Sequence, residues 1–260
     1  MTKEELLQDT ELFLIDLDGT VYLDDEPIFG VRETLEKLRA RNKKLVFLTN
    51  NSSKTPEEYE KKLLKMGLFV PESDAVFTSA MATISLLKRS FRGKKVHLLA
   101  TDAVKRQFEE EGVTLSEENP DVCVLAYDTT LTFEKMKKFN ENLVKGAYFI
   151  ATHPDDVCPT KDIPMPDVGS FLALFARSSS RVPDCICGKP HAMLAECVAS
   201  TFGVKSAHTC MVGDRAYTDI RFANANGMKS ILVLSGETKR GGWGEDVPDL
   251  VLEDFNGIFG

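Results

Sequence analysis

Two aspartates separated by one residue, Asp16 and Asp18, follow a short apolar run and precede Gly19. When a buried strand ends in a tight turn, both carboxylates can face one pocket, and a glycine relaxes the backbone there. Two carboxylates in different environments suit one nucleophile and one acid/base. We therefore expect Asp16 to attack a phosphorus atom. We expect Asp18 to protonate the leaving alkoxide and then to help activate water.

Three further polar clusters also follow apolar runs. They are Thr49-Asn50-Asn51, Gly188-Lys189-Pro190, and Gly213-Asp214 with Asp219. In an open parallel sheet, ligands bind outside the carboxyl ends of the strands, so clusters far apart in sequence converge at one edge. This convergence is the main evidence for a site, because any single cluster can arise by chance.

The residue types at these strand ends match the needs of phosphoryl transfer. The Thr49 hydroxyl can hold a phosphate oxygen, and Lys189 supplies a fixed positive charge for the transferring group. Asp214 adds a third oxygen ligand, and hard oxygen donors together with waters and phosphate match Mg²⁺. The metal would cancel the repulsion between carboxylates and phosphate. For Asp219, one helical turn beyond Asp214, the sequence leaves two roles open: support of the metal's water shell, or a pair with Lys189.

Short apolar runs alternate along the chain with amphipathic helical segments. The runs predict strands at 11–16, 44–49, 75–79, 96–100, 122–127, 147–152, 184–189, 209–214 and 230–235. Helices are expected near 31–38, from Pro56 to Gly67, at 102–111 and 132–145, from about Gly169, and at 191–202 and 216–226. The alternation predicts an α/β fold with a parallel sheet. We expect a core domain at 1–80 and 183–260, interrupted by an α/β insert at 81–182, with an irregular loop at 153–167.

Charge, hydropathy and cysteine content argue against several classes of partner and site. The 260 residues carry a net charge of -8, which disfavours a nucleic-acid partner. There is no secretory pattern and no run of the ~20 apolar residues that a membrane helix needs, so we expect a cytoplasmic protein with no membrane contact. The six cysteines lack a disulfide framework. The Cys185 and Cys187 pair lacks the partners of a complete metal site.

The motifs DLDGT, TNN, GKP and GDRAYTD together resemble those of the haloacid dehalogenase superfamily of phosphatases. Their order, their spacing and the large insert between the second and third motifs resemble the NagD-like branch, which includes p-nitrophenyl phosphatases. The resemblance covers nearly the whole chain. It implies a Rossmann-like core, a C2-type cap domain and hydrolysis of small phosphomonoesters through an aspartyl-phosphate.

The resemblance also implies a role for each matching position. Asp16 would be the nucleophile, Asp18 the general acid/base, and Thr49 and Lys189 would bind phosphate. Asp16, the backbone carbonyl of Asp18, and Asp214 would bind Mg²⁺, and Asn50 would lie near the substrate. The chain departs from the pattern at His153, where asparagine is expected in a cap loop associated with substrate choice. His153 is therefore either a plain loop residue or a substrate contact.

Other readings of the same residues remain. Asp16 and Asp18 could form an ordinary Asx-type turn, and Asp214 could only cap the next helix. On the same scaffold, a phosphotransferase or mutase would pass the phosphoryl group to a sugar hydroxyl. A non-catalytic sensor of a phosphorylated metabolite would be expected to have lost a nucleophile or ligand, and here all are present. The cap would roof the site and favour small phosphorylated metabolites, and a homodimer formed through the cap is expected by analogy.

Overall fold

The computed structural model describes residues 1–159 and 163–260, and it divides into two compact units. The first unit comprises Met1–Thr49, Pro56–Phe77 and Lys189–Gly260. The second comprises Asn50–Thr55 and Thr78–Gly188. Residues 50–55, 78–80 and 183–188, which we expected in the core, thus fall in the second unit.

A six-stranded sheet forms the centre of the first unit, in the order β15-β14-β13-β1-β4-β5. The strands are β1 (Leu12–Ile15), β4 (Lys44–Thr49), β5 (Asp74–Thr78), β13 (Thr209–Gly213), β14 (Lys229–Val233) and β15 (Leu250–Leu252). Every pairing from β15 to β4 is parallel. β1, in the middle of the sheet, is buried along its whole length, as its unbroken apolar sequence predicts.

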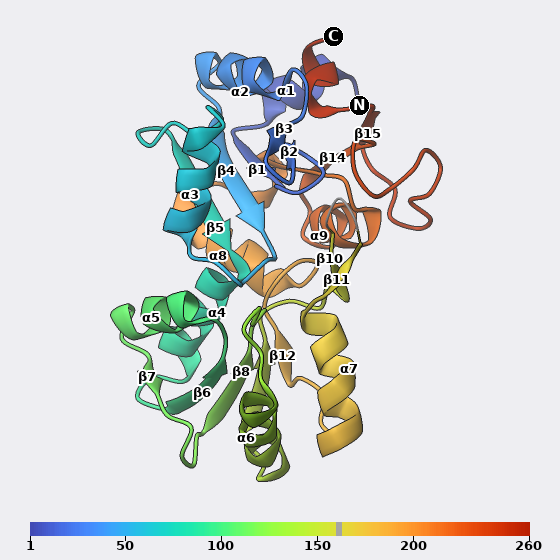
Figure 1. Ribbon diagram of the computed structural model, residues 1–260. Coiled ribbons are helices and arrows are strands. Elements are labelled where there is room, and N and C mark those ends of the chain that lie inside the picture. The colour runs from blue at the N-terminus through green and yellow to red at the C-terminus, as the bar shows by residue number, and fades with distance from the viewer. Residues whose placement is uncertain (160–162) are drawn as a thin grey trace. The chain divides into compact units, whose positions relative to one another are not determined.

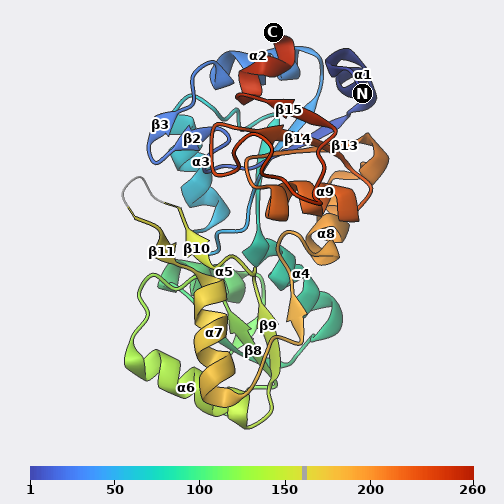
Figure 2. The ribbon, with the colours of Figure 1, turned by 90° about the vertical axis from the view of Figure 1, so that its right-hand side faces the viewer.

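Helices cover both faces of this sheet. They are α1 (Lys3–Asp9), α2 (Val31–Ala40), α3 (Pro56–Lys65), α8 (Ala192–Phe202) and α9 (Arg221–Ala225), with the shorter turns η1 (Ser206–His208), η2 (Ala216–Ile220) and η3 (Phe255–Phe259). Figure 2 shows α3 on one side and α8 and α9 on the other. Leu35 and Leu38 of α2 pack into the cluster that contains Phe13 of β1, whereas Ile220 packs against Leu232 on the opposite face. Burial on both faces explains the apolar strands.

The second unit has its own sheet of five strands, in the order β12-β9-β8-β6-β7. Its strands are β6 (Lys95–Leu99), β7 (Thr114–Leu115), β8 (Val122–Leu125), β9 (Tyr148–Ala151) and β12 (Cys185–Ile186), all paired in parallel. Its helices are α4 (Ser79–Ser90), α5 (Asp102–Glu110), α6 (Phe133–Val144) and α7 (Val168–Ser179). In Figure 2, α6 and α7 lie in front of this sheet and α4 and α5 behind it. The α/β class and the parallel sheets are as predicted.

One predicted strand lies in a different sheet from the expected one. The sequence predicts the run 184–189 to be a strand of the core, but β12 pairs with β9 of the second unit, with Cys185 opposite Ile150. The pairing continues beyond β12, because the Gly188 N–H donates to the Thr152 carbonyl at 2.7 Å. A run of this kind can join either sheet, since apolar character alone does not specify the partner strand. Lys189 is the first residue after this segment and belongs to the first unit.

Several short elements were not predicted. Within 153–167, which was expected to be irregular, β10 (Val157–Cys158) pairs antiparallel with β11 (Met165–Pro166), and residues 160–162 of that loop lie outside the described part. A small hairpin joins β2 (Tyr22–Leu23) to β3 (Glu26–Pro27) immediately after the Asp16 turn (Figure 1). The helix predicted at 216–226 begins as the π-helical turn η2.

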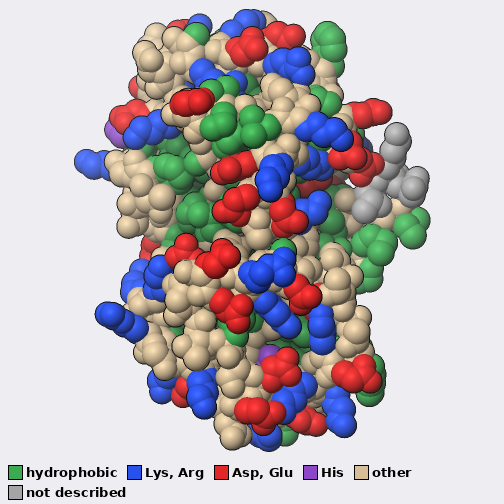
Figure 3. Space-filling model, turned by 60° about the vertical axis from the view of Figure 1, so that its left-hand side comes forward, with side chains coloured by type: hydrophobic (Ala, Val, Ile, Leu, Met, Phe, Trp, Pro, Cys, Tyr) green, Lys and Arg blue, Asp and Glu red, His purple; other side chains and the backbone are tan. Residues whose placement is uncertain are grey.

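On the face drawn in Figure 3, acidic and basic side chains are interspersed rather than gathered into a basic area. Among the residues that the structure describes, no helix has the length and apolar character needed to span a membrane.

Candidate active site

The carboxyl edge of the first sheet brings the predicted strand-end residues together. β1 lies between β4 and β13, with Ile15 opposite Phe47 on one side and Val212 on the other. The Asp16 N–H continues this ladder by donating to the Val212 carbonyl at 2.9 Å. Asp214 directly follows β13, and Thr49 is the last residue of β4. The register therefore places all three residues at one end of neighbouring strands.

Lys189 links two of the aspartates. Its ammonium donates to Oδ1 of Asp16 at 2.5 Å and to Oδ1 of Asp219 at 2.6 Å, and the lysine is 2% exposed. Burial alone would lower the pKa of Lys189, but the Asp16 and Asp219 carboxylates raise it well above its ordinary value. Lys189 is therefore a fixed positive charge. Of the two roles left open for Asp219, the structure shows the pair with Lys189.

Three carboxylates gather around one point. Asp16, Asp214 and Asp219 each offer an oxygen, and these oxygens lie within 4.8 Å of one another. Burial, only partly offset by the Lys189 charge, raises the pKa of Asp16 well above its ordinary value, and Asp219 and Asp214 raise it further. Burial, with Asp219 as a second cause, raises the pKa of Asp214 to about 7. One lysine cannot balance three carboxylates, so the site favours additional positive charge.

The donor set fits a hard divalent cation. All of the gathered ligands are carboxylate oxygens, the type that Mg²⁺ and Ca²⁺ prefer. Oδ1 of Asp214 is buried and has no hydrogen-bond partner among the described residues. A buried acceptor without a partner is costly, and a bound cation would satisfy it. Asp16 and Asp214, predicted to share an ion, are close enough to do so.

Two glycines make room for these carboxylates. At Gly19 the backbone has a φ of +89°, and a Cβ there would lie 2.6 Å from Oδ2 of Asp214. At Gly213 a Cβ would overlap the Asp219 carboxylate. The sequence predicts backbone freedom in a turn at Gly19. The structure adds a second reason, which is the close approach of Asp214.

Hydrogen bonds hold both the side chain and the backbone of Asp219 in place. Its second oxygen, Oδ2, accepts the Arg215 N–H at 3.1 Å, and its own N–H donates to the Arg215 carbonyl at 2.8 Å. The turn η2 thus directs the Asp219 carboxylate back towards the end of β13. One oxygen of Asp219 thus accepts from Lys189, and the other accepts from a peptide N–H.

The remaining predicted residues are placed as follows. Asp18 is half-buried in the turn between β1 and β2, where its backbone bridges to Tyr22, and its carboxylate is not part of the three-carboxylate cluster. Thr49 is buried at the end of β4. Asn50 belongs to the second unit, where its amide donates to both oxygens of Asp155 at 3.1 and 3.3 Å.

His153 lies in the same unit as Asn50 and is fully buried. Its Nδ1 is 3.8 Å from Oδ2 of Asp155, and its Nε2 is 3.5 Å from Oδ1 of Asp167. Both carboxylates are almost fully buried. Within its unit, His153 therefore joins the loop before β10 to Asp167, the residue that caps α7.

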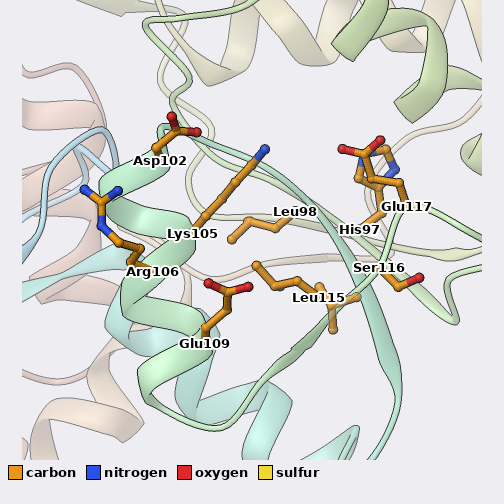
Figure 4. A pocket seen from close by; sticks show the side chains of 10 residues that line it. His97, Leu98, Asp102, Lys105, Arg106, Glu109, Leu115, Ser116 and Glu117 are labelled. Carbon is orange, nitrogen blue, oxygen red and sulfur yellow. The ribbon is translucent and has the colours of Figure 1, made fainter.

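A separate hollow in the second unit lies beside α5 and has a volume of about 410 Å³. Lys105 and Arg106 contribute positive charge to its wall, and Asp102, Glu109 and Glu117 contribute negative charge (Figure 4). Because the acidic side chains outnumber the basic ones, this pocket lacks the excess positive charge that would attract a phosphate. The strand-end cluster is the better candidate for phosphate chemistry.

Comparison with known families identifies related sequences. A family described as haloacid dehalogenase-like hydrolase matches residues 13–114, and a second, related family of the same hydrolase type matches residues 186–258. Together, these segments contain every residue of the strand-end cluster.

Individual proteins match over nearly the full chain. The sugar-phosphatase AraL of Bacillus subtilis is 34% identical over 248 residues, covering 94% of this chain and 90% of that protein. The crystal structure of a 4-nitrophenylphosphatase from Thermotoga maritima is 43% identical, with a TM-score of 0.93 and 97% of each chain covered. A glycerol phosphate phosphatase from Mycobacterium tuberculosis, solved in complex with magnesium, is 27% identical with a TM-score of 0.88, covering 97% of this chain and 78% of that one.

Proposed function

The chain belongs to the haloacid dehalogenase-like hydrolase family, and from this premise we propose that it is a magnesium-dependent phosphatase of small phosphomonoesters that works through an aspartyl-phosphate on Asp16. The observation that carries the proposal is the three-carboxylate cluster with Lys189 inside it. The phosphatases among the relatives, including AraL, support the reaction class.

Asp16 performs the first step. A carboxylate oxygen of Asp16 attacks phosphorus, the bond from phosphorus to the ester oxygen breaks, and Asp18 donates a proton to the departing alcohol. In the second step water attacks the phosphorus of the aspartyl-phosphate, Asp18 accepts the proton of that water, and the Asp16 carboxylate is regenerated. The product is inorganic phosphate.

Lys189 orients the nucleophile and balances charge. Its ammonium holds Oδ1 of Asp16 at 2.5 Å, and Asp219 fixes the ammonium from the other side. A buried, immobile cation is well placed to stabilise the charge that spreads over the phosphoryl oxygens. Thr49, at the end of the neighbouring strand, would donate its hydroxyl to the same oxygens, and Asn50 would contact the substrate.

Asp16, Asp214 and the backbone carbonyl of Asp18 would hold the magnesium ion. When bound, the ion neutralises the carboxylates and polarises the phosphate. The magnesium complex of the related glycerol phosphate phosphatase supports this choice of metal.

The second unit, which we place at Asn50–Thr55 and Thr78–Gly188, would act as a cap that favours small phosphorylated metabolites. A cytoplasmic location and a homodimer paired through this unit complete the proposal. Light scattering coupled to gel filtration would measure the oligomeric state.

Phosphate release from a panel of sugar, glycerol, nucleoside and nitrophenyl phosphates tests the function. We expect the wild-type protein to release inorganic phosphate from several of them, and Asp16→Asn to release none while keeping its circular dichroism spectrum. Asp9→Asn, an exposed aspartate of the same unit, is the matched control and should be fully active. Near-wild-type hydrolysis by Asp16→Asn would contradict the proposal.

A further inference from the structure

One residue separates the segment Ser235–Thr238 from the end of β14. The segment contains Gly236, the first glycine of a run that includes Gly241, Gly242 and Gly244. Glycine-rich sequence of this kind favours a flexible loop. In the structure, however, three of these four residues are held by hydrogen bonds to Gly19, Asp214 and Ala216. We call Ser235–Thr238 the Asp214 clamp.

The clamp contacts Asp214 at two atoms. The Glu237 N–H donates to Oδ2 of the Asp214 carboxylate at 2.7 Å, and the Thr238 N–H donates to the Asp214 carbonyl at 3.1 Å. Oδ1 of the same carboxylate has no partner within the described parts of the chain. One carboxylate oxygen is therefore occupied by the protein, and the other is left for a ligand.

Gly236 allows this close approach. A Cβ at position 236 would overlap the Asp214 side chain, with Oδ2, Cγ and Cβ as the nearest atoms. The peptide that carries the Glu237 N–H can reach the carboxylate only because no side chain intervenes. The absence of a side chain at Gly236 thus allows close contact with Asp214, and it need not make the loop mobile.

Three side chains anchor the clamp. Ser235 Oγ donates to the Gly19 carbonyl at 2.7 Å, in the turn that follows Asp16 and Asp18. Thr238 Oγ1 accepts the Ala216 N–H at 3.0 Å, and the threonine is buried. The Glu237 carboxylate accepts a hydrogen bond from the Tyr217 hydroxyl at 2.9 Å and lies 3.1 Å from Arg215 Nε.

We propose that the Asp214 clamp is a positioning element of the metal site, which fixes Asp214 so that Oδ1 alone is presented to the cation. The inference rests on the proposed function, because it assumes that Asp214 is a metal ligand. Ser235 and Thr238 are its positioning residues: their side chains bond to the backbone of Gly19 and Ala216 and act through the Glu237 peptide. Hydrogen bonds that orient metal ligands typically contribute about 10–100-fold to metal affinity.

Mg²⁺ binding measured by isothermal titration calorimetry, without substrate, tests the clamp. Thr238→Val keeps the shape of the side chain but removes the acceptor of the Ala216 N–H, and we expect its Mg²⁺ affinity to fall by about tenfold. Thr238→Ser restores the hydroxyl and should recover most of the affinity. Thr209→Val is the matched control, because Thr209 begins β13, the strand whose other end leads to Asp214, and its hydroxyl donates to the nearby Lys205 carbonyl. It should bind Mg²⁺ as the wild type does.

Ser235→Ala provides a second variant at the other end of the clamp, should Thr238→Val fail to fold. It should also weaken Mg²⁺ binding, and for both variants kcat at saturating Mg²⁺ should stay near the wild-type value. Wild-type Mg²⁺ affinity in folded Ser235→Ala and in folded Thr238→Val would overturn the inference.

Asp214→Asn separates this result from failure of the proposed function. If Asp214→Asn loses Mg²⁺ binding and the clamp variants do not, only the clamp is wrong. If Asp214→Asn also binds normally, the metal site itself is wrong.

Discussion

The Lys189 ammonium lies 2.5 Å from Oδ1 of Asp16, although the two residues are 173 positions apart in the chain. The pair joins the residue that follows β1 to the third residue after β12. Because Lys189 is also bound to Asp219, its charge cannot turn away towards solvent. The proposed nucleophile is thus held by a buried cation in the absence of substrate.

Replacing Lys189 by methionine should destabilise the protein as well as inactivate it. The change leaves buried carboxylates without their cation, which typically costs about 3–5 kcal/mol. Urea unfolding monitored by circular dichroism would measure the loss, and Mg²⁺ should recover part of it by supplying positive charge. Lys88→Met, which breaks an exposed pair with Glu111, should cost about 1 kcal/mol or less. Equal losses in the two variants would show that Lys189 is not an integral part of the charge balance.

Metal binding should stabilise the folded protein. A ligand that binds only the folded state adds about 1.4 kcal/mol to the free energy of unfolding for each tenfold rise above its Kd. We expect this slope for the wild-type protein in a Mg²⁺ titration, and no slope for Asp214→Asn. Asp246→Asn, which alters a surface pair with Arg221 in the same unit, should keep the wild-type slope.

Treatment with EDTA should abolish phosphate release, and full activity in metal-free buffer would contradict the proposed role of the metal.

Acid should destabilise the second unit through His97. Burial is the main cause that lowers the pKa of His97 from 6.5 to about 4, and Nδ1 of the ring lies 2.9 Å from Nδ2 of Asn142. Between these two pH values the unfolded chain binds a proton that the folded chain does not. The unfolding free energy should therefore fall by about 2–3 kcal/mol as the pH drops from about 6.5 to 4.

The pH dependence of the His97→Gln variant isolates this effect from the titration of other groups. Its unfolding free energy, measured in urea at each pH, should fall less steeply than that of the wild type. His208→Gln is the matched control, since His208 also adjoins an apolar strand but is exposed. If the wild-type and His97→Gln curves run parallel over this range, His97 is not buried in its neutral form.

The sequence predicted the main strands and the strand-end residues because both leave local signals. Unbroken apolar runs mark β1, β4 and β13, and parallel pairing brings their carboxyl ends to one edge. The helix α1 was missed although it has a local signal: Thr2 and Glu5 form a capping box. With Leu6 and Leu7 as its buried residues, this seven-residue segment is too short to show the apolar periodicity that marks the longer helices.

Other features could not be predicted because they depend on contacts between distant segments. The pairing of β12 with β9 joins Cys185 to Ile150, which is distant in the sequence. The pair between Asp219 and Lys189 depends on the turn η2, which returns the carboxylate towards β13. Likewise, the role of Gly236 becomes visible only when the Asp214 side chain is seen against it.

Detection of a phosphorylated Asp16 tests the central claim most directly. Enzyme mixed with a rapidly hydrolysed phosphomonoester and quenched in acid should yield, by mass spectrometry, a peptide that contains Asp16 and carries the mass of one phosphoryl group. The same peptide from Asp16→Asn should remain unmodified. If phosphate is released while no acyl-phosphate forms on wild-type Asp16, or if the phosphoryl group is found on another residue, the proposed mechanism is wrong.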